Sequence, residues 1–231
     1  MKKEIRNGVF QYFIRSVIAP VLLGAIFFLA AGTITFVNGW ILYGLFFVMS
    51  MVTNVILVLY NPELMYYRTR LNKEGIKEWD KVLMPVAVIT GLHLHALIMG
   101  LDIRYGWSNF NIENLPLGII IYLLSFLFVS WSMVVNRYFE PNVRLQSERN
   151  HQVISDGPYR YVRHPGYTGF ILGSFGSVLI IGSSVGLISA VISSLLIIIR
   201  TKLEDNTLQN ELSGYSDYAL KVRSKLFPGI W

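Results

Sequence analysis

Residues 157–167 read GPYRYVRHPGY and bring charged, aromatic and helix-starting groups together in one short segment. Tyr159 and Tyr167 offer ring faces, which attract cations electrostatically. Pro165 suits the first turn of a helix, where its missing N–H costs nothing. The free amides that follow it can bind anions, as helix N-termini generally do. The segment is therefore the first candidate for a ligand-binding loop.

Arg200 and Glu204 form a second charged pair at the end of an apolar run. They are four residues apart, so on a helix they share a face. Neither stays charged cheaply at a membrane boundary without a partner or water. They can pair with each other, although arginine before glutamate is the weaker orientation for such a pair. The alternative is that each binds a group of a ligand.

The histidines give no pattern for a metal site. His93 and His95 are two residues apart, so on a helix they point to different faces and cannot chelate one ion. They are expected to line a polar surface or to hydrogen-bond between helices. His164 can carry a proton, but its place between Arg163 and Pro165 favours ligand binding. Since the chain has no cysteine, we expect neither a metal centre nor thiolate chemistry.

The composition is that of a membrane protein. Hydrophobic residues make up 53% of the chain and charged residues 15%, and the mean hydropathy is +0.49, well outside the averages of soluble domains. The 231 residues accommodate four to six helices of about 20 residues but no second globular domain. We therefore expect one integral-membrane domain over residues 1–231.

Five apolar stretches predict an all-α, polytopic membrane bundle of about six transmembrane helices. They cover residues 17–37, 40–60, 82–101, 117–136 and 167–199. Each of the first four is long enough for one crossing. The fifth is longer than one crossing requires and has Gly182-Ser183-Ser184 at its middle, which predicts a short helical hairpin. Gly169 and Gly173 in its first arm have the spacing of close helix packing.

The same pattern divides the domain into two regions. Residues 1–136 hold four transmembrane helices, and residues 137–231 hold the candidate binding loop and the hairpin 167–199. Residues 203–218 mix apolar and charged residues at helical spacing. They are expected to continue the last helix out of the membrane and to cover the ligand.

Lysine and arginine gather at alternate ends of the predicted helices. The amino terminus, the loops after the second and fourth helices, and the tail are basic, whereas the opposite connections carry only Arg104. By the positive-inside rule, both termini and the candidate site face the cytosol. The net charge of +6 then meets anionic membrane lipids, and no nucleic-acid partner is needed. Glu140 and Glu148 flank one basic loop and are expected to be solvated.

Several motifs together resemble the isoprenylcysteine carboxyl methyltransferase family. The strongest resemblance covers residues 144–228 and includes Gln146, Glu148, His151, Gly157-Pro158-Tyr159, Arg163-His164-Pro165-Gly166-Tyr167, Arg200, Glu204-Asp205, Gly214-Tyr215, Tyr218 and Pro228. Asn61-Pro62-Glu63-Leu64 and Trp79-Asp80 add a weaker match to prokaryotic members. Related phospholipid methyltransferases and some sterol reductases share parts of the carboxy-terminal pattern. The motifs therefore specify fold and cofactor better than substrate.

The resemblance implies a membrane enzyme that uses S-adenosylmethionine, with a cytosolic cofactor pocket and a lipophilic acceptor that enters from the bilayer. Arg200 would orient the carboxylate of the acceptor. The implied cofactor-binding residues are Gln146, His151, Gln152, Val153, Ile154, Tyr159, His164, Pro165, Gly166, Tyr167 and Glu204. One departure is Asp205, where the family usually has a second glutamate, so a direct contact by this shorter acid is in doubt.

The chemistry of the residues agrees with that assignment. The cofactor carries an ammonium, a carboxylate, a sulfonium and an aromatic base, so its pocket needs an anion, hydrogen-bond donors and flat apolar surface. Glu204 can supply the anion, and the tyrosines can supply the surface. A carboxylic acid is already a nucleophile at neutral pH because its pKa is about 3.5. No general base is then needed, and most of the rate acceleration must come from positioning.

We therefore expect methyl transfer to a lipophilic acceptor, above all the carboxylate of a prenylated cysteine or a similar amphiphile. A phospholipid or other lipid amine is the alternative acceptor, but its ammonium form would be repelled by Arg200 and must lose a proton before attack. A second alternative is a nicotinamide-dependent, sterol-type reductase, in which Arg160 and Arg163 would hold the diphosphate. A non-catalytic scaffold would leave the clustered tyrosines, His164 and Glu204 without a role.

Overall fold

The computed structural model describes residues 2–70, 74–108 and 112–231, and within these ranges every regular element is helical. The elements are α1 Lys3–Ala31, α2 Val37–Tyr60, α3 Pro62–Thr69, α4 Glu78–Val88, η1 Ile89–Leu94, α5 His95–Tyr105, α6 Leu115–Val135, η2 Ser147–Arg149, η3 Gly157–Arg160, α7 Pro165–Ile181, α8 Gly186–Glu211 and α9 Tyr215–Lys221.

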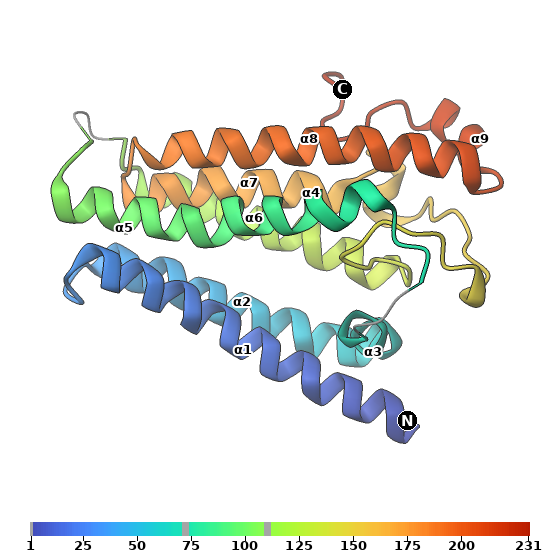
Figure 1. Ribbon diagram of the computed structural model, residues 1–231, viewed down its shortest axis with the longest axis horizontal. Helices are drawn as coiled ribbons and strands as arrows, with labels where there is room; N and C mark the ends of the chain where they lie inside the picture. The colour runs from blue at the N-terminus through green and yellow to red at the C-terminus, as the bar shows by residue number, and fades with distance from the viewer. Residues whose placement is uncertain (1, 71–73, 109–111) are drawn as a thin grey trace.

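Five of these helical segments are long and apolar enough to cross a membrane. They are α1, α2, the continuous segment Glu78–Tyr105, α6 and α8, and α7 is a shorter apolar helix. The predicted all-α bundle with a short helix near its carboxyl end is therefore confirmed. The long helices lie side by side, and α3, α9 and the loop between α6 and α7 gather at one end of the bundle (right in Figure 1).

The third crossing contains a π-helical turn. Pro85 lies inside α4, where its ring removes one backbone donor from the helix. The six-residue turn η1 follows directly and joins α4 to α5. π turns of this kind often occur at functional sites. Here the turn holds Gly91 against the ring of Phe170 in α7, so closely that a Cβ atom would lie 2.8 Å from the ring.

The predicted hairpin is present, but its second arm is longer than expected. α7 ends at Ile181 and is followed by Gly182, whose φ of 80° lies in the left-handed region, where a residue without a Cβ atom adopts the turn without strain. α8 starts at Gly186 and continues to Glu211, past the expected end of the hairpin at residue 199. The expected continuation of the last helix over 203–218 is confirmed as far as Glu211, and Gly214 at φ 80° then separates α8 from α9.

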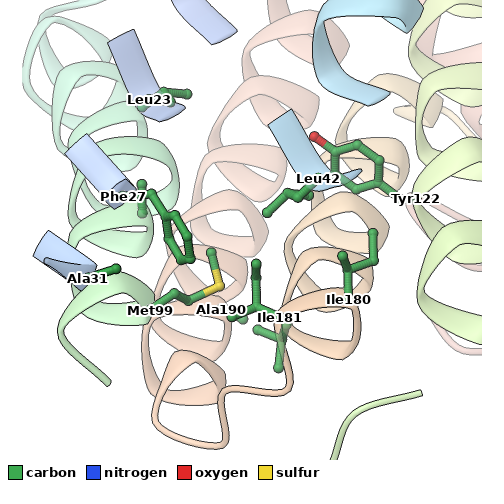
Figure 2. Close-up of a cluster of buried hydrophobic side chains, with 11 residues drawn as sticks. Leu23, Phe27, Ala31, Leu42, Met99, Tyr122, Ile180, Ile181 and Ala190 are labelled. Atoms are coloured by element: carbon green, nitrogen blue, oxygen red, sulfur yellow. The ribbon is translucent and has the colours of Figure 1, made fainter. Parts of the chain in front are cut away.

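The hydrophobic core lies where the hairpin meets the first helices (Figure 2). Phe27 from α1, Met99 from α5 and Ile180 from α7 are all fully or almost fully buried there. His95 adds polar contacts, since its Nδ1 lies 2.6 Å from Ser189 Oγ of α8 and its Nε2 lies 2.8 Å from Ser177 Oγ of α7. The expectation of an interhelical hydrogen bond is thus confirmed for His95.

Glycines allow α6 and α7 to approach closely. A Cβ atom on Gly169 would lie 2.7 Å from the Ser125 carbonyl oxygen and 2.7 Å from a methyl group of Val129. On Gly173 it would lie 3.1 Å from Ser125 Oγ. The small-residue spacing in α7 therefore marks helix packing, as predicted.

Gly169→Ala tests this close approach. The new methyl group must push α6 and α7 apart, because backbone is the nearest neighbour, and overpacking of this kind costs about 1–3 kcal/mol. The matched control is Gly44→Ala in α2, where a Cβ atom would meet nothing within 4 Å. Thermal unfolding in detergent should show a clear loss of stability for Gly169→Ala and no loss of stability for Gly44→Ala. Equal behaviour of the two variants would contradict the packing assignment.

Candidate active site

A cavity of about 320 Å³ lies where α4, α7 and α8 meet the loop after α6. This volume is within the usual range of small-molecule sites. Eleven of the twelve residues named above as candidates line it, and Pro165 does not. The lining candidates are Gln146, His151, Gln152, Val153, Ile154, Tyr159, His164, Gly166, Tyr167, Arg200 and Glu204. The structure thus brings together residues that are up to 58 positions apart in the sequence.

Tyr159 forms a buried aromatic wall of this cavity. Its hydroxyl accepts a hydrogen bond of 3.0 Å from Asn136 Nδ2 at the end of α6. Its carbonyl accepts one of 2.7 Å from the hydroxyl of Tyr218 in α9. Burial raises the pKa of Tyr159, so the ring stays neutral. Val153 and Ile154 pack beside it and complete an apolar surface.

The start of α7 is held in place by the chain after α9. The Arg163 amide donates to the Ser224 carbonyl at 3.0 Å, and the His164 amide donates to the Lys225 carbonyl at 2.9 Å. Leu226, which is 1% exposed, inserts into the core beside α7 and α8. This tail therefore fixes the backbone of the candidate loop, a role that its composition alone did not indicate.

Few amides at the start of α7 remain for a ligand. The amides of Tyr167 and Thr168 both donate to the His164 carbonyl, at 3.0 and 3.3 Å. The expectation of several free amides after Pro165 therefore reduces to Gly166. At Gly166 a Cβ atom would lie 2.5 Å from the Phe139 ring, so only glycine fits without displacing that ring.

A chain of hydrogen bonds runs from α4 through α8 to the cavity. Arg200 Nε and Nη2 donate to the two oxygens of Asp80, at 2.7 and 3.1 Å. Arg200 Nη2 also donates to the Pro141 carbonyl at 2.5 Å, and Nη1 donates to the Tyr167 hydroxyl at 2.5 Å. That hydroxyl in turn donates to Glu204 Oε2. Arg200 therefore reaches Glu204 through Tyr167, and the ion pair that it makes is with Asp80.

Glu204 ends this chain as a carboxylate at the cavity wall. Its side chain is 22% exposed, and His164 Nδ1 lies 4.0 Å from Oε2. Within the described ranges, Oε1 receives no hydrogen bond. The His164 ring stacks parallel to Tyr167 with their centroids 5.7 Å apart. Glu204 thus offers one open carboxylate oxygen beside two flat rings.

Asp205 has a structural role away from the cavity. It is fully buried and receives Arg163 Nε and Nη2 at 2.7 and 2.9 Å. The hydroxyl of Tyr215 and the amide of Gln209 also donate to it, at 3.0 and 2.9 Å. His164 Nε2 lies 3.3 Å away. The shorter acid therefore anchors the candidate loop and α9 to α8.

The segment 138–151 forms the polar rim of the cavity. Gln146 is 2% exposed, and its amide group is held by the Tyr138 carbonyl and by Arg149. Burial, followed by repulsion from Arg149, lowers the pKa of His151 to about 4. His151 is thus a neutral ring at physiological pH, able to accept or donate one hydrogen bond.

Glu140 corrects one expectation from the sequence. Its side chain is 1% exposed and pairs with Arg144, with Arg144 Nε 3.1 Å from Oε2. Glu148 is about half-exposed as expected, and it also pairs with Arg144 at 2.7 Å. Neighbouring charges in the sequence suggested solvation, but the folded segment turns Glu140 inward to neutralise Arg144.

Two contributors to the site were not predicted from the sequence. Asp80 was identified only as part of a motif, although an arginine inside an apolar helix signals that a buried acid must lie nearby. Arg68 lines the cavity from α3, and no pattern in the sequence singled it out. In the described part of the chain, no cluster of acidic residues and histidines could hold a metal ion.

Sequence comparisons identify the same region. The model of the isoprenylcysteine carboxyl methyltransferase (ICMT) family matches residues 117–210. Protein-S-isoprenylcysteine O-methyltransferase B of Arabidopsis thaliana is 26% identical over 127 residues, which cover 54% of this chain and 61% of the relative. The A form from the same plant is 28% identical over 131 residues, 55% of this chain and 63% of the relative. The chain thus spans a little over three fifths of each of these two relatives.

A solved structure shares the fold. The eukaryotic intramembrane Ras methyltransferase ICMT superposes with a TM-score of 0.53 at 16% sequence identity. The match covers 90% of this chain and 73% of the solved one. The bundle described above is therefore a multi-pass membrane fold of the same kind.

Arg200→Met tests the buried ion pair. It leaves the fully buried carboxylate of Asp80 without a counter-charge, which typically costs about 3–5 kcal/mol. The double variant Arg200→Met with Asp80→Asn removes the unpaired charge. It keeps an oxygen for the Val143 amide, which donates to Asp80, and should recover part of the lost stability. The control is Lys77→Met, because Lys77 pairs with Glu211 at the surface and should cost at most about 1 kcal/mol. If thermal unfolding shows that Arg200→Met loses no more stability than Lys77→Met, the assignment of a buried Arg200–Asp80 ion pair is contradicted.

Proposed function

Since the model of the ICMT family matches residues 117–210, we propose that this chain is a member of that family and an integral-membrane methyltransferase that uses S-adenosylmethionine. The acceptor is the carboxylate of a prenylated cysteine or of a similar amphiphile. The observation that carries the proposal is the carboxylate of Glu204, which is open on one oxygen and flanked by aromatic rings inside the 320 Å³ cavity.

The cavity fits the cofactor in charge and in surface. Glu204 would bind the ammonium, and Tyr159 and Tyr167 would lie against the base and the sulfonium. Gly166 would present its backbone, and neutral His151 would offer one hydrogen bond. Val153 and Ile154 give apolar surface on the same side. When bound, S-adenosylmethionine supplies an activated methyl group, and the protein supplies alignment and exclusion of water.

Gln146 would act on the cofactor through the rim of the site. Its side-chain amide is already engaged with the Tyr138 carbonyl and with Arg149. It therefore orders the segment that leads to His151 and Gln152. Pro165 likewise acts indirectly, because it starts α7 and sets the backbone of Gly166.

Arg200 is mainly a positioning residue in this account. A guanidinium has five N–H donors, and four hydrogen bonds connect Arg200 to Asp80, Pro141 and Tyr167. One N–H on Nη1 is left for the carboxylate of the acceptor. The arginine thus holds Tyr167 and the segment at Pro141 rigidly, and it can add a single hydrogen bond to the substrate.

The geometry gives less support to a nicotinamide-dependent reductase. Such an enzyme needs cations for a diphosphate, and the sequence offered Arg160 and Arg163. Arg163 is buried and bonded to Asp205, while Arg160 is exposed, pairs with Asp156 and does not line the cavity. Neither guanidinium is available to a ligand in the cavity.

We further propose that the cavity opens towards the cytosol. The basic amino terminus, α3, the loop after α6 and α9 lie at the same end of the bundle as the cavity-lining loop (Figure 1). The positive-inside rule orients that end to the cytosolic side. The cofactor would then enter from the cytosol and the acceptor from the bilayer.

An acceptor panel tests the proposal. Purified protein, with S-adenosylmethionine labelled in its methyl group, should methylate N-acetyl-S-farnesylcysteine and leave phosphatidylethanolamine unmodified. Because the acid needs no deprotonation above about pH 5, the kcat/KM should be flat between pH 6 and 8. Transfer to the amine lipid alone, or a rate that rises tenfold per pH unit, would contradict carboxylate methylation. The methyl ester of the same farnesylcysteine is the unreactive control.

A further inference from the structure

Arg68 is the one described cavity-lining residue that comes from α1, α2 or α3. The other lining residues belong to the chain from Met84 onwards. α3 lies with α1 and α2 on the opposite side of the bundle from α8 and α9 (Figure 1). Arg68 is therefore the point where the first part of the chain reaches the site.

Within the described parts of the chain, the charge of Arg68 is not balanced by a carboxylate. Four arginines line the cavity, and three of them have carboxylate partners: Arg144 with Glu140 and Glu148, Arg163 with Asp205, and Arg200 with Asp80. Among the described residues, no carboxylate oxygen lies within 4.0 Å of the Arg68 guanidinium. Arg68 is thus the exception in a cavity where every other guanidinium is neutralised.

The other contacts of Arg68 position its guanidinium without neutralising its charge. Nη1 donates to the Phe139 carbonyl at 2.8 Å. The rings of Phe139 and Tyr12 lie 5.6 and 5.9 Å from Cζ. Nε is buried and has no hydrogen-bond partner in the described parts of the chain. Arg68 as a whole is partly buried, but a buried donor without a partner is costly, so a bound anion that accepts a hydrogen bond from Nε would relieve this cost.

The surroundings connect Arg68 to the reaction site. The carbonyl of Phe139 binds Arg68, and the ring of Phe139 covers Gly166 at the start of α7. Two residues further on, the Pro141 carbonyl binds Arg200. The short segment 139–141 therefore accepts hydrogen bonds from Arg68 in α3 and from Arg200 in α8. An anion bound to Arg68 would lie in the cavity that Glu204 also lines.

Groups of opposite charge line this cavity. Glu204 attracts a cationic group and repels an acid, whereas Arg68 attracts an acid. Met84, Val88, Leu92 and Phe170 line the same cavity with apolar surface. One cavity therefore combines an anion, an unbalanced cation and an apolar region. This is what an amphiphilic acid and a cationic cofactor require together.

We infer that Arg68 is the residue that binds the carboxylate of the acceptor and selects an acid over neutral analogues. The inference rests on the proposed function. Arg200 has a single remaining donor, so it cannot form two hydrogen bonds to the carboxylate alone. A guanidinium can hold a carboxylate with two parallel hydrogen bonds.

The test compares binding of an acid with binding of its ester. N-acetyl-S-farnesylcysteine and its methyl ester differ only in the group that Arg68 would contact. Their affinities are measured on detergent-purified protein saturated with S-adenosylhomocysteine, so that no turnover occurs. Wild type should bind the acid at least about tenfold more tightly than the ester, since a charge-assisted hydrogen bond is worth one decade or more in affinity.

The variant is Arg68→Gln, which keeps an N–H for the Phe139 carbonyl. It should weaken binding of the acid about 10- to 100-fold, leave the ester within twofold, and leave the affinity for S-adenosylhomocysteine within twofold. Arg68→Lys keeps the positive charge but cannot form two parallel hydrogen bonds, so it should retain part of the preference for the acid over the ester. The matched control is Arg137→Gln, because Arg137 lies 4.9 Å over the Tyr138 ring but is exposed and outside the cavity lining.

The outcomes separate this inference from the proposed function. If Arg68→Gln keeps the wild-type ratio of acid to ester affinity, Arg68 is structural and the inference is wrong. If Arg68→Gln loses affinity for S-adenosylhomocysteine and keeps the ratio, Arg68 serves the cofactor, and the inference is also wrong. If wild type methylates an amine lipid and not the acid, the proposed function fails first. If Arg68→Gln does not fold, the ratio measured on Arg68→Lys decides: a partly reduced ratio supports the inference, and a wild-type ratio overturns it.

Discussion

The buried pair of Arg200 and Asp80 is the interaction on which the site depends. A guanidinium inside an apolar bundle must be neutralised, and here its pairing with Asp80 brings α4 against α8 across 120 positions of sequence. Once Arg200 is fixed, it holds the Tyr167 hydroxyl and the Pro141 carbonyl. Tyr167 then holds Glu204. One charge requirement thus places the rim segment, the first turn of α7 and the open carboxylate relative to one another.

A second buried ion pair, between Arg163 and Asp205, fixes the candidate binding loop 157–167 to α8. Arg200 and Asp205 lie on α8 on either side of Glu204 in sequence. Both are paired with a buried charge of the protein, whereas Glu204 keeps one open oxygen. The tail at Ser224 and Lys225 adds main-chain hydrogen bonds to the same loop. Such a rigid surround suits a reaction in which the acid is already nucleophilic and alignment is what the protein must supply.

The sequence predicted the membrane bundle and the hairpin well, because both follow from local signals. The lengths of the apolar runs give the crossings, and Gly182 breaks the fifth run at the hairpin turn. The continuation of α8 beyond Ile199 was also predicted, but the break at Gly214 was not, because helical spacing persists across it. Eleven of the residues that line the cavity were found through a family resemblance. The roles of Asp80, Arg68 and Glu140 were not, since these residues reach the site through tertiary contacts that no local spacing records.

The most direct test of the account is calorimetric titration of the detergent-purified protein with S-adenosylhomocysteine and, separately, with a reduced nicotinamide dinucleotide. The account predicts saturable binding of the first only. It also predicts that Glu204→Gln weakens that binding about 10- to 100-fold, since a charged hydrogen bond is lost. The control is Glu211→Gln on the same helix, where the surface pair with Lys77 has no part in the cavity, and its affinity should be unchanged. Binding of the dinucleotide alone, or wild-type affinity in Glu204→Gln, would contradict the account.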